Sequence, residues 1–308
     1  MIYDCFTFFN ELPLLELRLK LLSPYVDKFV LVEMSQTQRG EPKPYYFEEN
    51  RHLFSEYADK IICIHPENIP VMEENRGWLL ENFQRRSMSN GLVDCNPDDI
   101  IMISDLDEIP DPRIIKDMDK YFVKPRWPYH LDAKFRYWRR KLRGDFSWLY
   151  KRMSIKDALD KHAVSCSLYL FHYFLNCRST SLWSGTIMVK YKNLKYYGKF
   201  DEVTQDLRNI RSAIPYVENA GWHFSYLGGK EAVKRKLASV VDDRPAINAI
   251  MDRCQTDDEY LERCLYEGID LYGKIGDDYK FEFIDMEYIG VPNIEWFIKK
   301  YPHLYMDK

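Results

Sequence analysis

The first 110 residues alternate short apolar runs with segments of helical periodicity, and this alternation most constrains the fold. The apolar runs have the length of strands and are rich in Ile, Val, Leu and Phe: 2–9, 29–32, 61–64 and 100–103. Helical patterns lie between them, at 14–22, 47–57 and 78–89. Strands that alternate with helices indicate right-handed crossovers and a largely parallel sheet covered on both faces. The sequence therefore predicts an α/β fold, in which ligands bind beyond the carboxyl ends of the strands.

The pattern changes after residue 110. A stretch rich in basic and aromatic residues covers 134–152, and the apolar runs 168–175 and 186–191 indicate antiparallel or mixed strands. The dipeptide Gly228-Gly229 precedes a helical pattern, and short helices and loops are expected after it. Because no repeat and no long flexible linker interrupts the chain, we predict one mixed domain with a C-terminal helical extension.

Charge and cysteine content exclude several classes of protein. The 44 basic and 48 acidic residues give a formal net charge of −4, so the chain as a whole does not attract nucleic acid. Seven cysteines are scattered without a Cys-x-x-Cys pair, which indicates neither a disulfide framework nor a zinc ribbon and fits a reducing compartment. No apolar run approaches the ~18 to 20 residues of a membrane span, and the sequence opens directly on a strand pattern. We therefore expect a cytoplasmic protein that binds no nucleic acid.

Three carboxylates follow directly on the apolar run 100–103: Asp105, Asp107 and Glu108. In a parallel sheet they would lie at the edge where ligands bind. Side chains alternate along an extended segment, so Asp105 and Asp107 share one side, where their oxygens can converge on a hard divalent cation that accompanies a diphosphate. A polar loop that caps a helix is the alternative, because Asp is also favoured there. We expect metal binding.

Five separated blocks of sequence resemble glycosyltransferase family 17, in the same order along the chain. The blocks are IYDCFTFFNE at 2–11, VLVE at 30–33 with Lys43-Pro44 downstream, ENFQR at 81–85, ISDLDEIP at 103–110 and AGWHFSYLGG at 220–229. The resemblance implies a GT-A type nucleotide-sugar-binding fold, with a mostly parallel central sheet flanked by helices. It also implies inverting transfer of GlcNAc from UDP-GlcNAc, with Mn²⁺ or Mg²⁺ as cofactor.

The resemblance also implies a domain organisation. Residues 1–240 would form a GT-A-like catalytic domain, with a nucleotide-binding half at 1–110 and an acceptor half at 111–240. Residues 241–308 would form a helical extension packed on the same domain. Animal Golgi enzymes of the family carry a membrane anchor and a stem, and no such segment is recognisable in this sequence. We therefore expect the acceptor to be a glycan or a glycolipid precursor met in the cytoplasm.

Metal ligands follow from the resemblance and from the chemistry of a diphosphate leaving group. Asp107, with Asp105 beside it, would hold the cation that neutralises the leaving group. Glu108 would complete the metal shell or bond a ribose hydroxyl. His223 is the candidate third ligand, although a lone His in an aromatic run is equally well explained as a core residue.

Inversion requires one carboxylate or His to accept the proton of the acceptor hydroxyl. Glu218, just before the last family block, is the first choice for this base. Asp201 and Glu202 are the alternatives. Most of the 48 acidic residues are expected to lie on the solvated surface, so each of these assignments competes with that simpler interpretation.

Donor contacts are predicted from five further residues. Gln84 and Arg85, on the helix before the metal strand, could reach the uracil or the diphosphate, or could simply form a helix surface. Glu11 follows the first strand and would meet the nucleotide or cap the next helix. Trp222 could stack on a sugar face, as could Trp183, although Trp in a strand is also typical of a core.

Two questions stay open from the sequence. Arg139, Arg140 and Arg143 belong to the basic stretch, which could hold an anionic acceptor, touch a membrane surface peripherally, or form a solvated loop. The Asp-x-Asp pair also fits a magnesium-dependent phosphatase of the haloacid dehalogenase kind, from which Ile109 departs, and a carbohydrate-binding protein without catalysis is the third alternative. The sequence predicts no oligomeric state.

Overall fold

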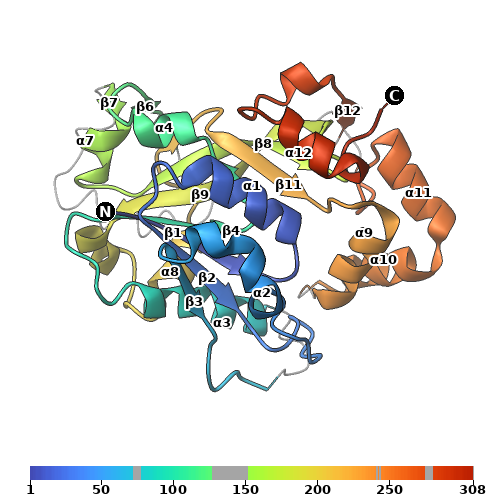
Figure 1. The fold of residues 1–308 in the computed structure, drawn as a ribbon, viewed down its shortest axis with the longest axis horizontal. Coiled ribbons are helices and arrows are strands. Elements are labelled where there is room, and N and C mark those ends of the chain that lie inside the picture. The colour runs from blue at the N-terminus through green and yellow to red at the C-terminus, as the bar shows by residue number, and fades with distance from the viewer. Residues whose placement is uncertain (72–77, 127–151, 241, 243, 275–279, 308) are drawn as a thin grey trace.

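A mixed ten-stranded sheet forms the centre of the part of the chain described by this computed structural model, residues 1–71, 78–126, 152–240, 242, 244–274 and 280–307 (Figure 1). Its strands are β1 (Ile2–Phe8), β2 (Lys28–Glu33), β3 (Ile61–Ile64), β4 (Ile100–Asp105), β5 (Glu108–Pro110), β8 (Val164–His172), β9 (Cys177–Lys190), β10 (Tyr216–Val217), β11 (Gly221–Ser225) and β12 (Phe281–Phe283). The order is β3-β2-β1-β4-β9-β8-β11-β5, with β10 beside β8 and β12 beside β9. Two short strands, β6 (Phe122–Val123) and β7 (Met153–Ser154), pair separately.

The helices connect and cover these strands. They are α1 (Leu12–Leu22), α2 (Tyr46–Asn50), α3 (Leu79–Arg86), α4 (Pro112–Lys116), α7 (Ile155–Leu159), α8 (Val203–Asn209), α9 (Gly229–Ser239), α10 (Pro245–Thr256), α11 (Asp258–Glu267) and α12 (Glu295–Lys300). Short 3-10 helices lie at Arg51–Tyr57, Ser87–Gly91, Tyr191–Tyr196, Met286–Tyr288 and Pro302–Leu304.

Parallel pairing joins the strands expected in the first third of the chain. β1 lies between β2 and β4 and is parallel to both, and β2 is parallel to β3. β8 is likewise parallel to β10 and β11. The α/β class with a mostly parallel central sheet is therefore confirmed. β4 ends at Asp105, so the apolar run does lead into the carboxylates at the carboxyl end of the parallel strands.

Alternation along β1 divides its side chains between two apolar layers. Phe6 and Phe8 pack in one buried cluster with Leu15 and other leucines of α1, which crosses in front of the sheet in Figure 1. Cys5 packs in a second buried cluster with Leu207 of α8. Both faces of the parallel strands are thus covered, as predicted, because each face carries a continuous apolar surface that must be removed from water.

The second half of the sheet is antiparallel where the sequence indicated it. β9 runs antiparallel to both β4 and β8, and β5 runs antiparallel to β11. After β11, helices α9, α10 and α11 share a third apolar cluster and lie together at one end of the molecule in Figure 1. β12 pairs with β9, so the C-terminal extension contributes a strand as well as helices. The domain boundaries at 110 and 240 stay predictions.

The basic stretch falls mostly outside the described part of the chain. Arg139, Arg140 and Arg143 lie within 127–151, which the structure does not describe, so their predicted contact with an acceptor or a membrane is not placed. Within the described ranges, no helix combines the length and the apolar character that crossing a bilayer requires.

Candidate functional site

A pocket of about 250 Å³ opens at the carboxyl ends of β1 and β4. The wall opposite these strand ends is formed by residues of β11, by the C-terminal half of α9, and by Met251 and Tyr272. Polar residues that line the pocket include Glu11, Gln84, Arg85, Asp105, Asp107, His223 and Lys236. A ligand site at this edge is what the parallel strand order predicts.

Arg18 holds the carboxylate loop from inside the fold. It is fully buried on α1 and forms a two-point ion pair with Asp4 of β1, at 2.6 and 2.8 Å. Its Nη1 also donates to the carbonyl oxygens of Asp105, Leu106 and Glu108, at 3.0, 2.9 and 3.0 Å. Backbone acceptors buried away from water need donors. A single guanidinium supplies them here and fixes the turn after β4.

Asp105 is held by two arginines. Arg85 of α3 donates to both carboxylate oxygens at 3.0 Å, and Arg208 of α8 donates to Oδ2 at 2.7 Å. Burial alone would raise the pKa of Asp105, but Arg208 and Arg85 hold it well below its usual range. Arg85 also pairs with Glu81 at 2.5 Å. Asp105 lines the pocket as a permanently charged group whose oxygens already have strong partners.

Glu108 is fully buried and is not among the described residues that line the pocket. Arg208 donates to its two oxygens at 2.6 Å each, and the indole nitrogen of Trp183 donates at 2.6 Å. The sequence analysis expected Glu108 to complete a metal shell or bond a ribose. The structure instead uses it as the counter-ion of Arg208, because a charge of zero exposure persists only when it is paired.

Asp107 faces two cationic or titratable groups across the pocket. Its Oδ2 accepts from Lys236 of α9 at 2.8 Å, and its Oδ1 lies 3.5 Å from Nε2 of His223. Burial would raise the pKa of Asp107, but Lys236 and then His223 lower it well below the usual value. Burial would likewise lower the pKa of Lys236, yet Asp107 and Glu11 raise it. Both groups therefore stay charged at neutral pH.

β11 reaches this position because its first residue is a glycine. Gly221 has φ of +142°, and a Cβ there would lie 2.2 Å from the carbonyl oxygen of Ile109 in β5. Only glycine tolerates both the conformation and the close approach. The antiparallel pairing of β11 with β5 then sets His223 opposite Glu108, one residue beyond Asp107.

The donor set of Asp107 and His223 fits a divalent cation, whereas the oxygens of Asp105 are already bound by two arginines. Asp107 offers a carboxylate oxygen and His223 an imidazole nitrogen, 3.5 Å apart. Nδ1 of His223 is buried and has no hydrogen-bond partner within the described residues, so the ring lacks the second-shell contact that normally orients a ligating His. Asp105 would first have to give up its contacts with Arg85 and Arg208.

The other predicted donor contacts divide into two groups. Glu11, Gln84 and Arg85 line the pocket. The amide nitrogen of Gln84, however, already donates to the carbonyl oxygens of Phe8 and Val32, at 3.1 and 2.9 Å. Trp222 is 2% exposed and donates to the Ile289 carbonyl at 2.8 Å. Trp222 is thus a core residue, which the sequence analysis held as its alternative.

The structure does not bring the predicted base to this pocket. Glu218 follows β10 and pairs with Lys124 at the surface, its side chain 40% exposed. Asp201 is exposed in the turn before α8. Neither is among the residues that line the pocket within the described part of the chain. The assignment of either as base stays a prediction.

Sequence reasoning missed the three cations that hold these carboxylates: Arg18, Arg208 and Lys236. The burial of Arg18 could have been predicted, because it lies between Leu17 and Leu19 in an apolar helical segment. A cation buried there needs a buried anion as its partner. The positions of Arg208 and Lys236 could not have been predicted, because an Arg or Lys on a mixed helix is ordinarily a surface residue.

His172, at the end of β8 behind the pocket, gives a pH prediction. It is buried and stacks on Phe281 with ring centroids 4.4 Å apart, and its Nδ1 lacks a hydrogen-bond partner in the described structure. Burial, then His223 and Lys236, lower the pKa of His172 to about 3. The folded state therefore keeps it neutral while the unfolded state takes up a proton below about pH 6.5.

The free energy of unfolding should consequently fall as the pH drops from about 6.5 towards 3. The contribution of one such group is at most about 1.4 kcal/mol per pH unit. We expect His172→Phe to make this dependence shallower, measured by urea denaturation at pH 7, 6 and 5. His52→Phe, at an exposed position, is the control. Equal slopes for the wild type and His172→Phe would contradict the burial argument.

The fold and pocket define an α/β protein with a charged ligand site at the carboxyl edge of its parallel strands. Residues 1–134 match the family model described as glycosyltransferase family 17, which confirms the resemblance over that part of the chain. The β-1,4-mannosyl-glycoprotein 4-β-N-acetylglucosaminyltransferases of human and mouse are 31% and 30% identical to this chain over 107 residues. That stretch is 33% of this chain and 20% of either enzyme. The aligned part of the chain thus spans about a fifth of the length of these curated relatives.

Solved structures of sugar transferases are also similar, at low identity. A mannosyltransferase from Pyrobaculum calidifontis, in complex with GDP-Man and Mn²⁺, is 12% identical, with a TM-score of 0.32. The similarity covers 84% of this chain and 71% of that one. Glucosyl-3-phosphoglycerate synthase from Mycobacterium tuberculosis is 12% identical, with a TM-score of 0.29. This similarity covers 92% of this chain and 86% of the synthase chain.

Proposed function

We propose that this chain is an inverting, metal-dependent glycosyltransferase of GT-A type. It would transfer GlcNAc from UDP-GlcNAc to a hydroxyl of a glycan or glycolipid acceptor in the cytoplasm. The observation that carries the proposal is the convergence of the Asp107 carboxylate, the His223 imidazole and the Lys236 ammonium in a pocket at the edge of a parallel sheet. The family match over residues 1–134 supports the same class of reaction.

The leaving group of such a reaction is a nucleoside diphosphate, and its charge must be compensated as the bond to the sugar breaks. Asp107 and His223 would hold Mn²⁺ or Mg²⁺, which supplies that positive charge when bound. Lys236, which donates to Asp107 at 2.8 Å from the opposite wall, adds an ammonium next to the proposed cation. The side chain of Glu11, 3.6 Å from Lys236, keeps that ammonium between two carboxylates.

The rigidity of the carboxylate loop, residues 105–108, is the second feature that would favour this reaction. Arg18, Arg85 and Arg208 together fix the backbone of this loop and the side chains of Asp105 and Glu108. Charged groups stabilise a transition state best when they need not reorganise during the reaction. The arginines therefore act as positioning residues for Asp107.

The same contacts oppose the phosphatase alternative. An aspartate nucleophile needs a free oxygen to attack phosphorus. The oxygens of Asp105 are bound by Arg85 and Arg208, and burial next to two guanidinium groups stabilises the carboxylate in its ground state. A transferase needs no nucleophile from the protein at this position.

A donor screen tests the proposed function. The thermal shift of the chain is measured with Mn²⁺ and a panel of UDP, GDP and CMP sugars. We expect stabilisation by UDP-GlcNAc and UDP, because a ligand that binds only the folded state adds about 2.7 kcal/mol at a hundred times its dissociation constant. EDTA should abolish the shift. Absence of a shift with every nucleotide sugar, or hydrolysis of an aryl phosphate, would contradict the proposal.

A further inference from the structure

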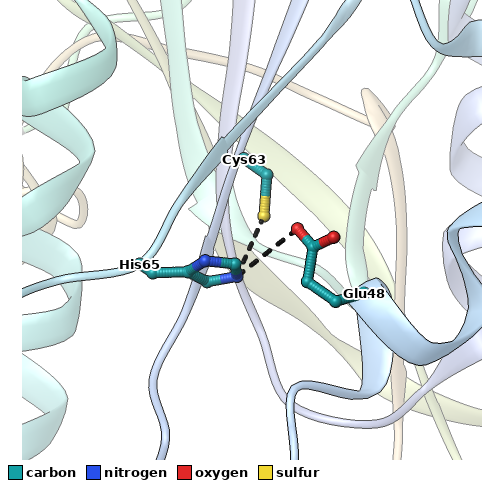
Figure 2. A group of neighbouring side chains, drawn as sticks. All are labelled: Glu48, Cys63 and His65. Atoms are coloured by element: carbon teal, nitrogen blue, oxygen red, sulfur yellow. Dashed lines mark hydrogen bonds and ion pairs between the residues drawn. The ribbon is translucent and has the colours of Figure 1, made fainter.

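Three side chains of different chemistry meet away from the pocket, at the carboxyl end of β3 (Figure 2). Glu48 comes from α2, Cys63 from β3, and His65 from the segment that follows β3. Their ligand atoms all lie within 4.8 Å of one another. Figure 2 shows the thiol and the carboxylate directed at the same edge of the imidazole ring. None of the three lines the pocket of the proposed function.

The distances match the edges of a tetrahedron around zinc. Sγ of Cys63 lies 3.4 Å from Nε2 of His65, and Oε1 of Glu48 lies 3.6 Å from the same nitrogen. Zinc bonds of about 2.3 Å to sulfur and about 2.0 Å to nitrogen or oxygen, at tetrahedral angles, place sulfur and nitrogen about 3.5 Å apart. They place nitrogen and oxygen about 3.3 Å apart.

The geometry does not suit a nucleophilic cysteine. A thiol activated by an acid–His relay needs the thiol on one ring nitrogen and the carboxylate on the other. Here the thiol and the carboxylate share Nε2 of His65. An arrangement in which sulfur, nitrogen and oxygen point at a common centre is what a metal site requires instead.

We propose that Glu48, Cys63 and His65 form a Zn²⁺ site, with water as the fourth ligand. A thiolate with an imidazole and a carboxylate favours zinc over magnesium or calcium, which prefer oxygen ligands alone. The side chains of His65 and Glu48 are 31% and 35% exposed, so a metal ion has access and the fourth position faces solvent. The ring of Tyr45, 4.0 Å from that of His65, holds the imidazole in place.

Arg51 is a neighbouring positive charge that would lower the affinity of this site for Zn²⁺. It donates to both carboxylate oxygens of Glu48, at 2.5 and 2.8 Å. A cation this close opposes the arrival of Zn²⁺, so its removal should tighten binding. Bound zinc would tie α2 to β3. α2 is already anchored to the end of β2, where Glu33 accepts from the backbone N–H groups of Tyr46 and Phe47.

Cobalt substitution tests the proposal on the full chain, reduced with a phosphine. Co²⁺ bound by a thiolate gives a sulfur-to-cobalt charge-transfer absorption that oxygen and nitrogen ligands do not give. We expect one equivalent of Co²⁺ to produce this band and Zn²⁺ to remove it by competition. Cys63→Ser should abolish the band and weaken Zn²⁺ binding by more than the about 10- to 100-fold that loss of a second-shell partner costs. Cys95→Ser, at another half-buried free thiol, should leave both unchanged.

Two further variants keep the result unambiguous. Arg51→Gln leaves all three ligands in place and should tighten Zn²⁺ binding severalfold, even if Cys63→Ser folds poorly. Asp107→Ala should keep the thiolate band, so a failure of the proposed donor site would not be confused with a failure of this one. The proposal is overturned if the wild type shows no thiolate band, if the band survives in Cys63→Ser, or if Arg51→Gln weakens binding.

Discussion

In Asp107→Ala we expect UDP affinity to fall at least tenfold and sugar transfer to fall by about 10²-fold or more, with the fold intact. Asp107 is the carboxylate that Lys236 and His223 share, and the proposed cation would lose its only anionic ligand in the described site. The diphosphate would then leave without its counter-charge. Calorimetry with UDP and Mn²⁺, together with initial-rate kinetics, measures the two effects separately.

Asp98→Ala is the matched control, because Asp98 is a surface aspartate paired with Lys192 at 2.6 Å. It should bind UDP as the wild type does. Undiminished UDP affinity in Asp107→Ala would remove the metal pair from the proposal. The cation that faces the diphosphate would then be Lys236 alone, and EDTA would leave donor binding unchanged.

Arg18→Met should cost about 3 to 5 kcal/mol of unfolding free energy, the largest stability effect that we expect. The substitution leaves Asp4 as an unpaired buried charge and takes a donor from three buried carbonyl groups. That loss is a large fraction of the stability of an ordinary domain. Urea denaturation measures it, and UDP affinity should fall in parallel because the loop that carries Asp107 loses its support.

Two companion variants separate this interpretation from a general sensitivity to arginine loss. Arg253→Met removes an exposed pair with Asp257 on the surface of α10 and should cause no measurable loss. Adding Asp4→Leu to Arg18→Met removes the unpaired charge and should restore part of the stability. If Arg18→Met were as stable as Arg253→Met, the buried pair would not be what supports the loop.

The fold could be predicted best where local pattern alone decides it. β3 occupies the expected 61–64, and β4 begins at the expected residue 100, because each is an apolar run bounded by polar residues. β5 was not predicted, since Glu108–Pro110 contains a proline and becomes a strand only through its pairing with β11. β9 begins at Cys177 rather than 186, because pairing with β12 and β8 extends it through polar residues.

The same distinction between local pattern and tertiary contacts applies to the site. The position of Asp105 and Asp107 at the carboxyl edge followed from the strand before them, and both do line the pocket. Which cation each would meet could not follow, because Arg208 and Lys236 approach from helices far along the chain. The tertiary fold therefore decided that Asp105 pairs with arginines and that Asp107 pairs with Lys236 in the pocket.

The separation between these charges along the chain has a consequence for biosynthesis. Glu108 is 100 residues from Arg208, and Asp107 is 129 residues from Lys236. At about 5 to 20 residues per second, a ribosome needs on the order of 5 to 25 seconds to make the later partners after the carboxylates have been made. During that interval the acidic loop can pair only with the cations that precede it in the chain, Arg18 and Arg85. The contacts of Glu108 with Arg208 on α8 and of Asp107 with Lys236 on α9 can therefore form only after most of the chain has been synthesised.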